Sequence, residues 1–180
     1  MTRVELLAAD GAPLTAARYY ADDGSASPVV RALAQVPELL EVTAPFVSRL
    51  FGPTSVDGRT KEVVVLRVSA RNGCRYCVET HTVAAWEAGL SVEETSAICG
   101  DAAGLDEPDR TLVTWCDAVA GPGPVPDSVV AELRRRRPEH EIVELALLAA
   151  ATVMLNRFCT ALELPTSPQT LARLEEVGLR

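Results

Sequence analysis

Apolar residues recur along most of this chain at the three- and four-residue spacing that is typical of amphipathic helices. Alanine and leucine dominate, β-branched runs are short, and proline and glycine fall at intervals that suit helix ends. No stretch has a convincing strand pattern, and we find neither a repeat nor a low-complexity tract. The pattern predicts an all-α fold with about eight helices.

Helix-breaking and capping residues set the expected boundaries. Asn72 and Gly73 form a favourable C-terminal stop, and Ser91 with Glu94 forms a capping box. The helical segments are therefore expected at 29–51, with a break or bend at Pro37, and at 58–73, 74–89, 91–100, 107–121, 126–137, 139–162 and 167–180.

The turn-like stretch ADDGSASP separates the beginning of the chain from the first long helical pattern. We expect residues 1–25 to form an N-terminal arm and residues 26–180 to form one helical domain. A chain of 180 residues is long enough for a sizeable core.

Neither a membrane span nor a leader is predicted. The longest apolar run, Leu145–Leu155, has 11 residues, whereas a bilayer needs about 20. Glu5 and Asp10 interrupt the region where a signal peptide would be continuously apolar. We therefore expect a cytoplasmic protein in which this run is a buried helix segment.

The charge balance excludes one class of partner. With 17 basic and 25 acidic residues, the formal net charge is −8. Recognition of phosphate groups needs clustered positive charge, so nucleic acids and anionic membrane surfaces are not expected partners.

The five cysteines are an odd number without a secretory signal, which argues against a disulfide framework and for a reducing compartment. Cys99, Cys116 and Cys159 stand alone within apolar helices, so we interpret them as small core residues. Cys74 and Cys77 are different, because they form a C-x-x-C pair.

Cys74, Cys77 and His81 share one helix face. At about 100° of rotation per residue they fall within roughly 60° of one another. They also occupy the first turns of the predicted helix, where unpaired N–H groups and the helix dipole favour a thiolate. His81 lies one turn beyond Cys77 and can exchange a proton there. The pattern favours dithiol redox chemistry.

Glu62 is expected to join this group. It lies 11 residues before Gly73, and His81 lies eight residues after it. If the chain folds back at this turn, the register differs by three residues, about 4.5 Å along the helix axis. A glutamate side chain, alone or with one water, spans that gap, so a carboxylate–imidazole proton relay is predicted.

The arrangement of Glu62, Cys74, Cys77 and His81 resembles the motif of the alkylhydroperoxidase D family, within the carboxymuconolactone decarboxylase-like superfamily. The resemblance is strong over 59–90 and weaker over 141–164. It implies an all-α homo-oligomer that reduces hydroperoxides without a metal or cofactor; a trimer or hexamer is preferred, and a dimer stays open. It also implies that the two cysteines cycle between dithiol and disulfide, that Glu62 and His81 relay protons, and that a dithiol of thioredoxin or lipoyl type restores the enzyme.

We assign peroxide attack to Cys77, because His81 lies one turn away, and the resolving role to Cys74, nearer the exposed helix start. A thiolate that attacks the distal peroxide oxygen becomes a sulfenic acid, and the second cysteine converts it into a disulfide.

Other interpretations stay open. Structural zinc would need four protein ligands, and no second cysteine or histidine pair is present. The C-x-x-C pair could also be inert. A carboxymuconolactone decarboxylase-like lyase would need a basic or polar cluster for a carboxylated substrate, and a non-catalytic redox sensor would use the same cysteines. Asn156 and Arg157 could line a pocket, although helix packing is the simpler role.

Overall fold

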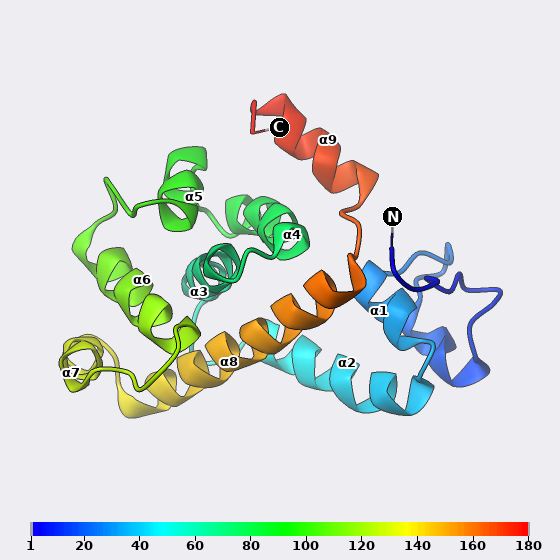
Figure 1. Ribbon diagram of the computed structural model, residues 1–180, viewed down its shortest axis with the longest axis horizontal. Coiled ribbons are helices and arrows are strands. Elements are labelled where there is room, and N and C mark those ends of the chain that lie inside the picture. Colours follow the sequence, from blue (N-terminus) through cyan, green and yellow to red (C-terminus); the bar gives the residue numbers. More distant parts are fainter. Residues whose placement is uncertain (1, 180) are drawn as a thin grey trace.

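In the computed structural model, which describes residues 2–179, those residues form nine α-helices and a short 3₁₀ helix with no strand (Figure 1). Met1 and Arg180, the ends of the predicted arm and of the last predicted helical segment, lie outside the described residues. The elements are η1 (Leu14–Tyr19), α1 (Pro28–Leu33), α2 (Pro37–Phe51), α3 (Gly58–Arg71), α4 (Arg75–Glu87), α5 (Val92–Cys99), α6 (Glu107–Ala120), α7 (Asp127–Arg134), α8 (Glu139–Leu162) and α9 (Pro168–Glu176). The all-α prediction is confirmed, and the break expected near Pro37 separates α1 from α2.

The central helix is α3, which packs against α4, α5, α6 and α8 (Figure 1). The run Val63–Leu66 and Val68 are almost completely buried. A helix that is apolar on nearly every side is stable only in the middle of a core. Glu62 is therefore held on the central, most tightly surrounded helix of the fold.

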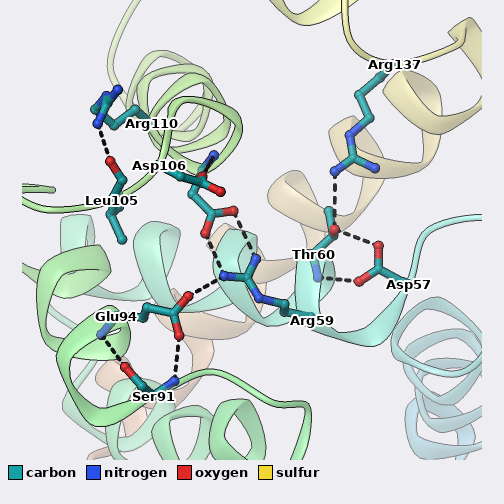
Figure 2. Close-up of polar contacts among 10 residues, drawn as sticks. Asp57, Arg59, Thr60, Ser91, Glu94, Leu105, Asp106, Arg110 and Arg137 are labelled. Carbon is teal, nitrogen blue, oxygen red and sulfur yellow. Dashed lines mark hydrogen bonds and ion pairs between the residues drawn. The ribbon is translucent and has the colours of Figure 1, made fainter.

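Local capping explains where the helices around the site begin and end. Asp57 accepts a hydrogen bond from the Thr60 backbone N–H at 2.9 Å, and the predicted Ser91–Glu94 capping box is present (Figure 2). Asn72 ends α3, and Gly73 has a φ of +65°, a conformation that favours glycine. The predicted stop at Asn72–Gly73 is thereby confirmed.

Charged contacts fix the first turn of α3 against its neighbours. The Arg59 guanidinium lies 2.6 Å from a Glu94 oxygen on α5 (Figure 2). It also lies 2.8 Å from an Asp109 oxygen on α6. On another side, the buried Lys61 ammonium donates to the Leu50 carbonyl at 2.8 Å and lies 3.0 Å from Glu144 on α8. These partners hold α3 relative to α2, α5, α6 and α8.

By length and composition alone, α8 could cross a membrane. It instead supplies one buried face to the core, and it packs against α3. The buried residues of α8 are Leu145, Leu148, Ala149, Ala151, Thr152, Asn156 and Cys159. A core helix of a soluble protein passes the same test of length and composition, and the fold is consistent with a soluble protein.

The N-terminal segment lies against α1, α2 and the end of α8 (Figure 1). The Arg3 backbone N–H donates to the Leu162 carbonyl at 3.0 Å, and the Tyr20 hydroxyl donates to the Leu7 carbonyl at 3.0 Å. Ala16 in η1 is completely buried. The segment thus covers part of the helical body, while its division at residue 25 from a separate domain stays a prediction.

Candidate active site

The C-x-x-C pair occupies the start of α4. Cys74 is the N-cap residue of that helix, with an extended backbone, and Cys77 lies in the first turn. The two cysteines are not joined by a disulfide, and their sulfur atoms are 2.9 Å apart. A disulfide bond is about 2.05 Å long, so only a short movement of the two sulfurs is needed to form one when an oxidant removes two electrons.

Both thiols are buried, which corrects the expectation that Cys74 lies at an exposed helix start. Cys74 is 1% exposed and Cys77 is 5% exposed. The reason is tertiary, because Phe158, Leu162 and Leu164 from the end of α8 and the chain after it pack around them. Proximity to a helix start therefore did not give Cys74 access to solvent.

The predicted proximity of Glu62 and His81 is present. His81 Nδ1 lies 2.9 Å from Glu62 Oε2, in direct contact without an intervening water. Both side chains are largely buried, and the Phe51 ring lies 5.5 Å from the imidazole, centroid to centroid. The carboxylate orients the imidazole, which also lines the cavity described below.

Cys159 on α8 is a third member of the site. Its sulfur and those of Cys74 and Cys77 all lie within 4.8 Å of one another, and the residue is 2% exposed. The expectation that Cys159 is an isolated core residue is wrong: it is buried, but against the other two cysteines. Cys116 fits the core interpretation, because it is completely buried in the main apolar cluster, and Cys99 packs against that cluster while half-buried.

The three sulfurs do not share negative charge equally. Hydrogen bonds from Cys159 and then from Cys77 hold the pKa of Cys74 well below its usual range. For Cys77, a hydrogen bond from Cys159 lowers the pKa, but its bond to Cys74, burial and the charge of Cys74 outweigh this and raise it. Hydrogen bonds to Cys74 and Cys77, together with burial, raise the pKa of Cys159. These hydrogen bonds favour negative charge on Cys74 over the other two sulfurs.

Three neighbouring thiols could bind a soft metal, and they are the one such group of histidine, cysteine and acidic residues found within residues 2–179. Zinc–sulfur bonds of about 2.3 Å would place tetrahedral ligand sulfurs about 3.8 Å apart. The 2.9 Å contact between Cys74 and Cys77 is much shorter. This geometry suits a pair that forms a disulfide better than a pair that shares a metal.

A polar side chain from α8 supports the turn before α4. Asn156 is completely buried; its amide donates to Ser69 Oγ at 3.0 Å, and it accepts from the Asn72 amide at 3.3 Å. It also lies against Cys77, where its hydrogen bond lowers the thiol pKa. Asn156 therefore has the packing role that was expected, and in addition it contacts the site.

A mostly apolar cavity of about 580 Å³ opens beside Cys77 and His81. Its walls come mainly from α1, α2 and η1, with α4 and α8 supplying the cysteine side. Its lining residues are Tyr19, Ser27, Val29, Val30, Leu33, Leu40, Thr43, Ala44, Pro45, Val47, Ser48, Phe51, Tyr76, Cys77, Thr80, His81, Leu155 and Cys159. The lining contains no lysine, arginine or carboxylate, so this cavity suits an uncharged, mainly apolar molecule.

A second, smaller cavity of about 280 Å³ lies on the other side of the cysteines. Cys74 lines this cavity and not the larger one, whereas Cys77 lines only the larger one. Cys159 and Tyr76 line both. The dithiol is thus reached from two sides, one for each of its cysteines.

Sequence reasoning placed Glu62, Cys74, Cys77 and His81 together, and the structure brings all four to this region. It missed Cys159 and the cavity wall formed by α2 and η1. The spacing of Asn156 and Cys159 on the buried face of α8 is compatible with a site, but nothing in that spacing points to α4.

Comparison with known proteins agrees with this architecture. Residues 37–114 match the model of the carboxymuconolactone decarboxylase family. No curated protein matches the chain.

Three solved structures have similar folds. An uncharacterized peroxidase-related protein from Ralstonia eutropha JMP134, described as an alkylhydroperoxidase AhpD core, has a TM-score of 0.84 at 16% identity, covering 94% of both chains. An uncharacterized peroxidase-related protein from Silicibacter sp. TM1040 has a TM-score of 0.82 at 20% identity, covering 94% of this chain and 93% of the other. The debrominase Bmp8, in complex with 2,3,4-tribromopyrrole, has a TM-score of 0.75 at 18% identity, covering 86% and 84%.

The matched family region contains α2, α3, α4 and α5, the first three of which hold Glu62, the cysteine pair, His81 and much of the cavity wall. The neighbouring structures extend the likeness over nearly the whole chain, although at their low identities they establish only the fold. The chain therefore has the fold of AhpD-like proteins, and its residues 37–114 match the carboxymuconolactone decarboxylase family.

Proposed function

We propose that this protein is a thiol-dependent peroxidase that reduces organic hydroperoxides through the Cys74–Cys77 pair. One observation carries the proposal: two free sulfurs lie 2.9 Å apart, and one of them shares an apolar cavity with a histidine that is paired to a carboxylate. A nucleophilic thiol, an adjacent base and a group that orients the base are the parts that covalent catalysis needs.

The first chemical step is assigned to Cys77, the cysteine of the pair that lines the larger cavity. Its raised pKa means that the thiol must lose its proton as it reacts. His81 accepts this proton, and Glu62 stabilises the imidazolium that forms. The Cys77 sulfur attacks the distal peroxide oxygen, the O–O bond breaks, and the alkoxide leaves as alcohol after taking the proton from His81. The product on the enzyme is a sulfenic acid.

Cys74 completes the oxidative half of the cycle. Its lowered pKa favours the thiolate, which attacks the sulfenic sulfur; the S–O bond breaks, and the hydroxide leaves as water after taking a proton from solvent. The enzyme is then a Cys74–Cys77 disulfide, oxidised by two electrons relative to the dithiol. An external dithiol of thioredoxin or lipoyl type returns those electrons by exchange.

The cavity lining favours this reaction over a decarboxylase-type lyase activity. A carboxylated substrate would need cationic partners, and none of the described residues that line the cavity is lysine or arginine. An organic hydroperoxide has no charge and an apolar body, which matches the lining.

A second candidate activity is thiol-dependent dehalogenation. The debrominase Bmp8 has this fold and binds 2,3,4-tribromopyrrole, a small halogenated aromatic molecule. The same dithiol supplies two electrons in either reaction, so the two activities are separated by the substrate and not by the redox centre.

The test is steady-state turnover of cumene hydroperoxide with dihydrolipoamide as reductant, with tribromopyrrole as a parallel substrate. We expect many turnovers per enzyme with the hydroperoxide, and a Cys74–Cys77 peptide that loses two hydrogen atoms before reductant is added. Stoichiometric oxidation without turnover would indicate a redox sensor. Thiols that stay free in a folded protein exposed to excess hydroperoxide would refute the dithiol mechanism.

We also propose that the protein is a homo-oligomer of the reducing cytoplasm, trimer or hexamer in preference to dimer. Apolar side chains are exposed at helical spacing on two helices, and water would be excluded from them in an interface. They are Leu39, Val42 and Phe46 on α2 and Val143, Leu147 and Met154 on α8. Light scattering at micromolar protein should give a mass several times that of the 19.2 kDa chain. A monomer at that concentration would contradict this prediction.

A further inference from the structure

The peroxidase cycle described above uses two thiols, yet the site contains three. Cys159 belongs to α8, and its sulfur lies within 4.8 Å of both sulfurs of the C-x-x-C pair. To reach the disulfide length of about 2.05 Å, it must approach either one by less than about 2.8 Å. A change of staggered rotamer at one cysteine moves its sulfur by roughly that distance. A side-chain rotation is therefore enough to bring the Cys159 sulfur within bonding distance of a partner sulfur.

The position of Cys159 between the two cavities adds a second observation. Cys77 lines the larger, apolar cavity, Cys74 lines the smaller one, and Cys159 lines both. A disulfide between Cys74 and Cys77 would engage the Cys77 sulfur, which must be free to react with the hydroperoxide. A disulfide between Cys74 and Cys159 would face the smaller cavity and leave Cys77 reduced.

We propose that Cys159 is a third redox thiol of this centre, which takes the disulfide over from Cys77 and presents it to the reductant in the smaller cavity. This inference rests on the proposed peroxidase function. It assigns the larger cavity to the hydroperoxide and the smaller one to the dithiol that restores the enzyme.

The transfer is a balanced thiol–disulfide exchange. Cys159 loses its proton, and its thiolate attacks Cys74 of the Cys74–Cys77 disulfide. The Cys74–Cys159 bond forms, the Cys74–Cys77 bond breaks, and Cys77 leaves as a thiolate that takes up a proton. No electrons are gained or lost overall. The external dithiol then reduces Cys74–Cys159 and is itself oxidised to a disulfide.

The same geometry allows Cys159 to replace Cys74 as the resolving thiol. In a Cys74→Ser variant, the Cys159 sulfur attacks the sulfenic sulfur of Cys77. The S–O bond breaks, the S–S bond forms, and the hydroxide leaves as water with the thiol proton. This variant therefore separates the redox role of Cys159 from the ordinary cycle.

Disulfide mapping of wild-type protein tests the proposal directly. The protein is oxidised with one equivalent of cumene hydroperoxide, quenched in acid at increasing times, alkylated and digested. We expect Cys74–Cys77 to appear first and Cys74–Cys159 to follow. If Cys159 is alkylated in every oxidised molecule while Cys74–Cys77 is present, the third-thiol role is overturned and the peroxidase function stands. If no disulfide forms at all, the peroxidase function itself fails.

Cysteine variants test the redox role of Cys159 independently. Cys74→Ser should form a Cys77–Cys159 disulfide, whereas Cys74→Ser combined with Cys159→Ser should keep a sulfenic acid on Cys77 that dimedone traps. Adding Cys116→Ser instead, a matched buried cysteine outside the site, should leave the Cys77–Cys159 link intact. A sulfenic acid that persists in Cys74→Ser while Cys159 remains free would overturn the proposal.

Cys159→Ser alone distinguishes redox chemistry from hydrogen bonding. Serine keeps a donor at this position and alanine does not. If Cys159 acts only as a donor to Cys74, serine should preserve the wild-type rate of reduction by dihydrolipoamide and alanine should not. We expect the opposite: both variants should slow the reductive half-reaction to a similar extent.

Discussion

Replacing Cys77 by serine is expected to lower hydroperoxide turnover to the background rate of the reductant, a loss of at least about 10³-fold, because removal of a covalent nucleophile costs several orders of magnitude. Cys77 is the sulfur of the C-x-x-C pair that lines the larger cavity together with His81. A serine hydroxyl in the same place is too poor a nucleophile to cleave the O–O bond. Steady-state rates with cumene hydroperoxide, and the stoichiometric burst without reductant, measure this loss.

The matched control is Cys99→Ser, a half-buried cysteine in α5 away from the site, which should keep normal turnover. Circular dichroism and thermal melting should show that both variants are folded. Cys74→Ser should keep the burst, because Cys74 acts after the peroxide has been reduced. Because the pKa of Cys74 is lowered, the informative contrary result is that the two variants exchange their behaviour. A burst that survives in Cys77→Ser and disappears in Cys74→Ser would make Cys74 the nucleophile.

His81→Ala and Glu62→Gln are expected to slow turnover by about 10²–10⁴-fold, the usual contribution of general acid–base catalysis. Nδ1 of His81 is held by Glu62 at 2.9 Å, so the glutamine variant removes the charge that stabilises the imidazolium while keeping the shape. Both variants should remain folded, and the smaller defect is expected for Glu62→Gln because the imidazole is still present.

The pH profile distinguishes a proton relay from a positioning role. The pKa of Cys77 is raised above its ordinary value, so the thiol is protonated at neutral pH and its thiolate fraction increases as pH rises toward that pKa. An enzyme without its base depends on this fraction, and an enzyme with its base does not. The rate of His81→Ala should therefore approach the wild-type rate as pH increases, and the approach should continue above pH of about 8.5, where a free thiol would already be half ionised.

The control is His140→Ala, which removes the other, exposed histidine at the start of α8 and should match wild type at every pH. Cys77→Ser should stay inactive across the whole range. A His81→Ala defect that is equally deep at low and high pH would mean that His81 positions the substrate or the cavity wall. The relay assigned to Glu62 would then lose its support as well.

Much of this architecture could be predicted because its causes are local in the sequence. The capping box at Ser91, the stop at Asn72–Gly73 and the break before Pro37 depend on side chains within a few residues of the backbone groups that they satisfy or block. The helical period placed Cys77 and His81 on one face of α4. The closeness of Glu62 to His81 followed from two helices of known rise that meet at one short turn.

The remaining features depend on contacts between distant parts of the chain. Cys159 follows Cys77 by 82 residues, and only the packing of α8 against α4 brings their sulfurs together. The same packing buries Cys74, which its place at a helix start had suggested would be exposed. The lowered pKa of Cys74 depends on Cys159 as a hydrogen-bond donor, and the apolar wall of the cavity comes mainly from α1 and α2. Periodicity shows which face of a helix is buried, because the apolar side chains that avoid water can be identified from the sequence of that helix alone. It does not show which partner covers that face, because the partner is chosen by the packing of all the helices at once.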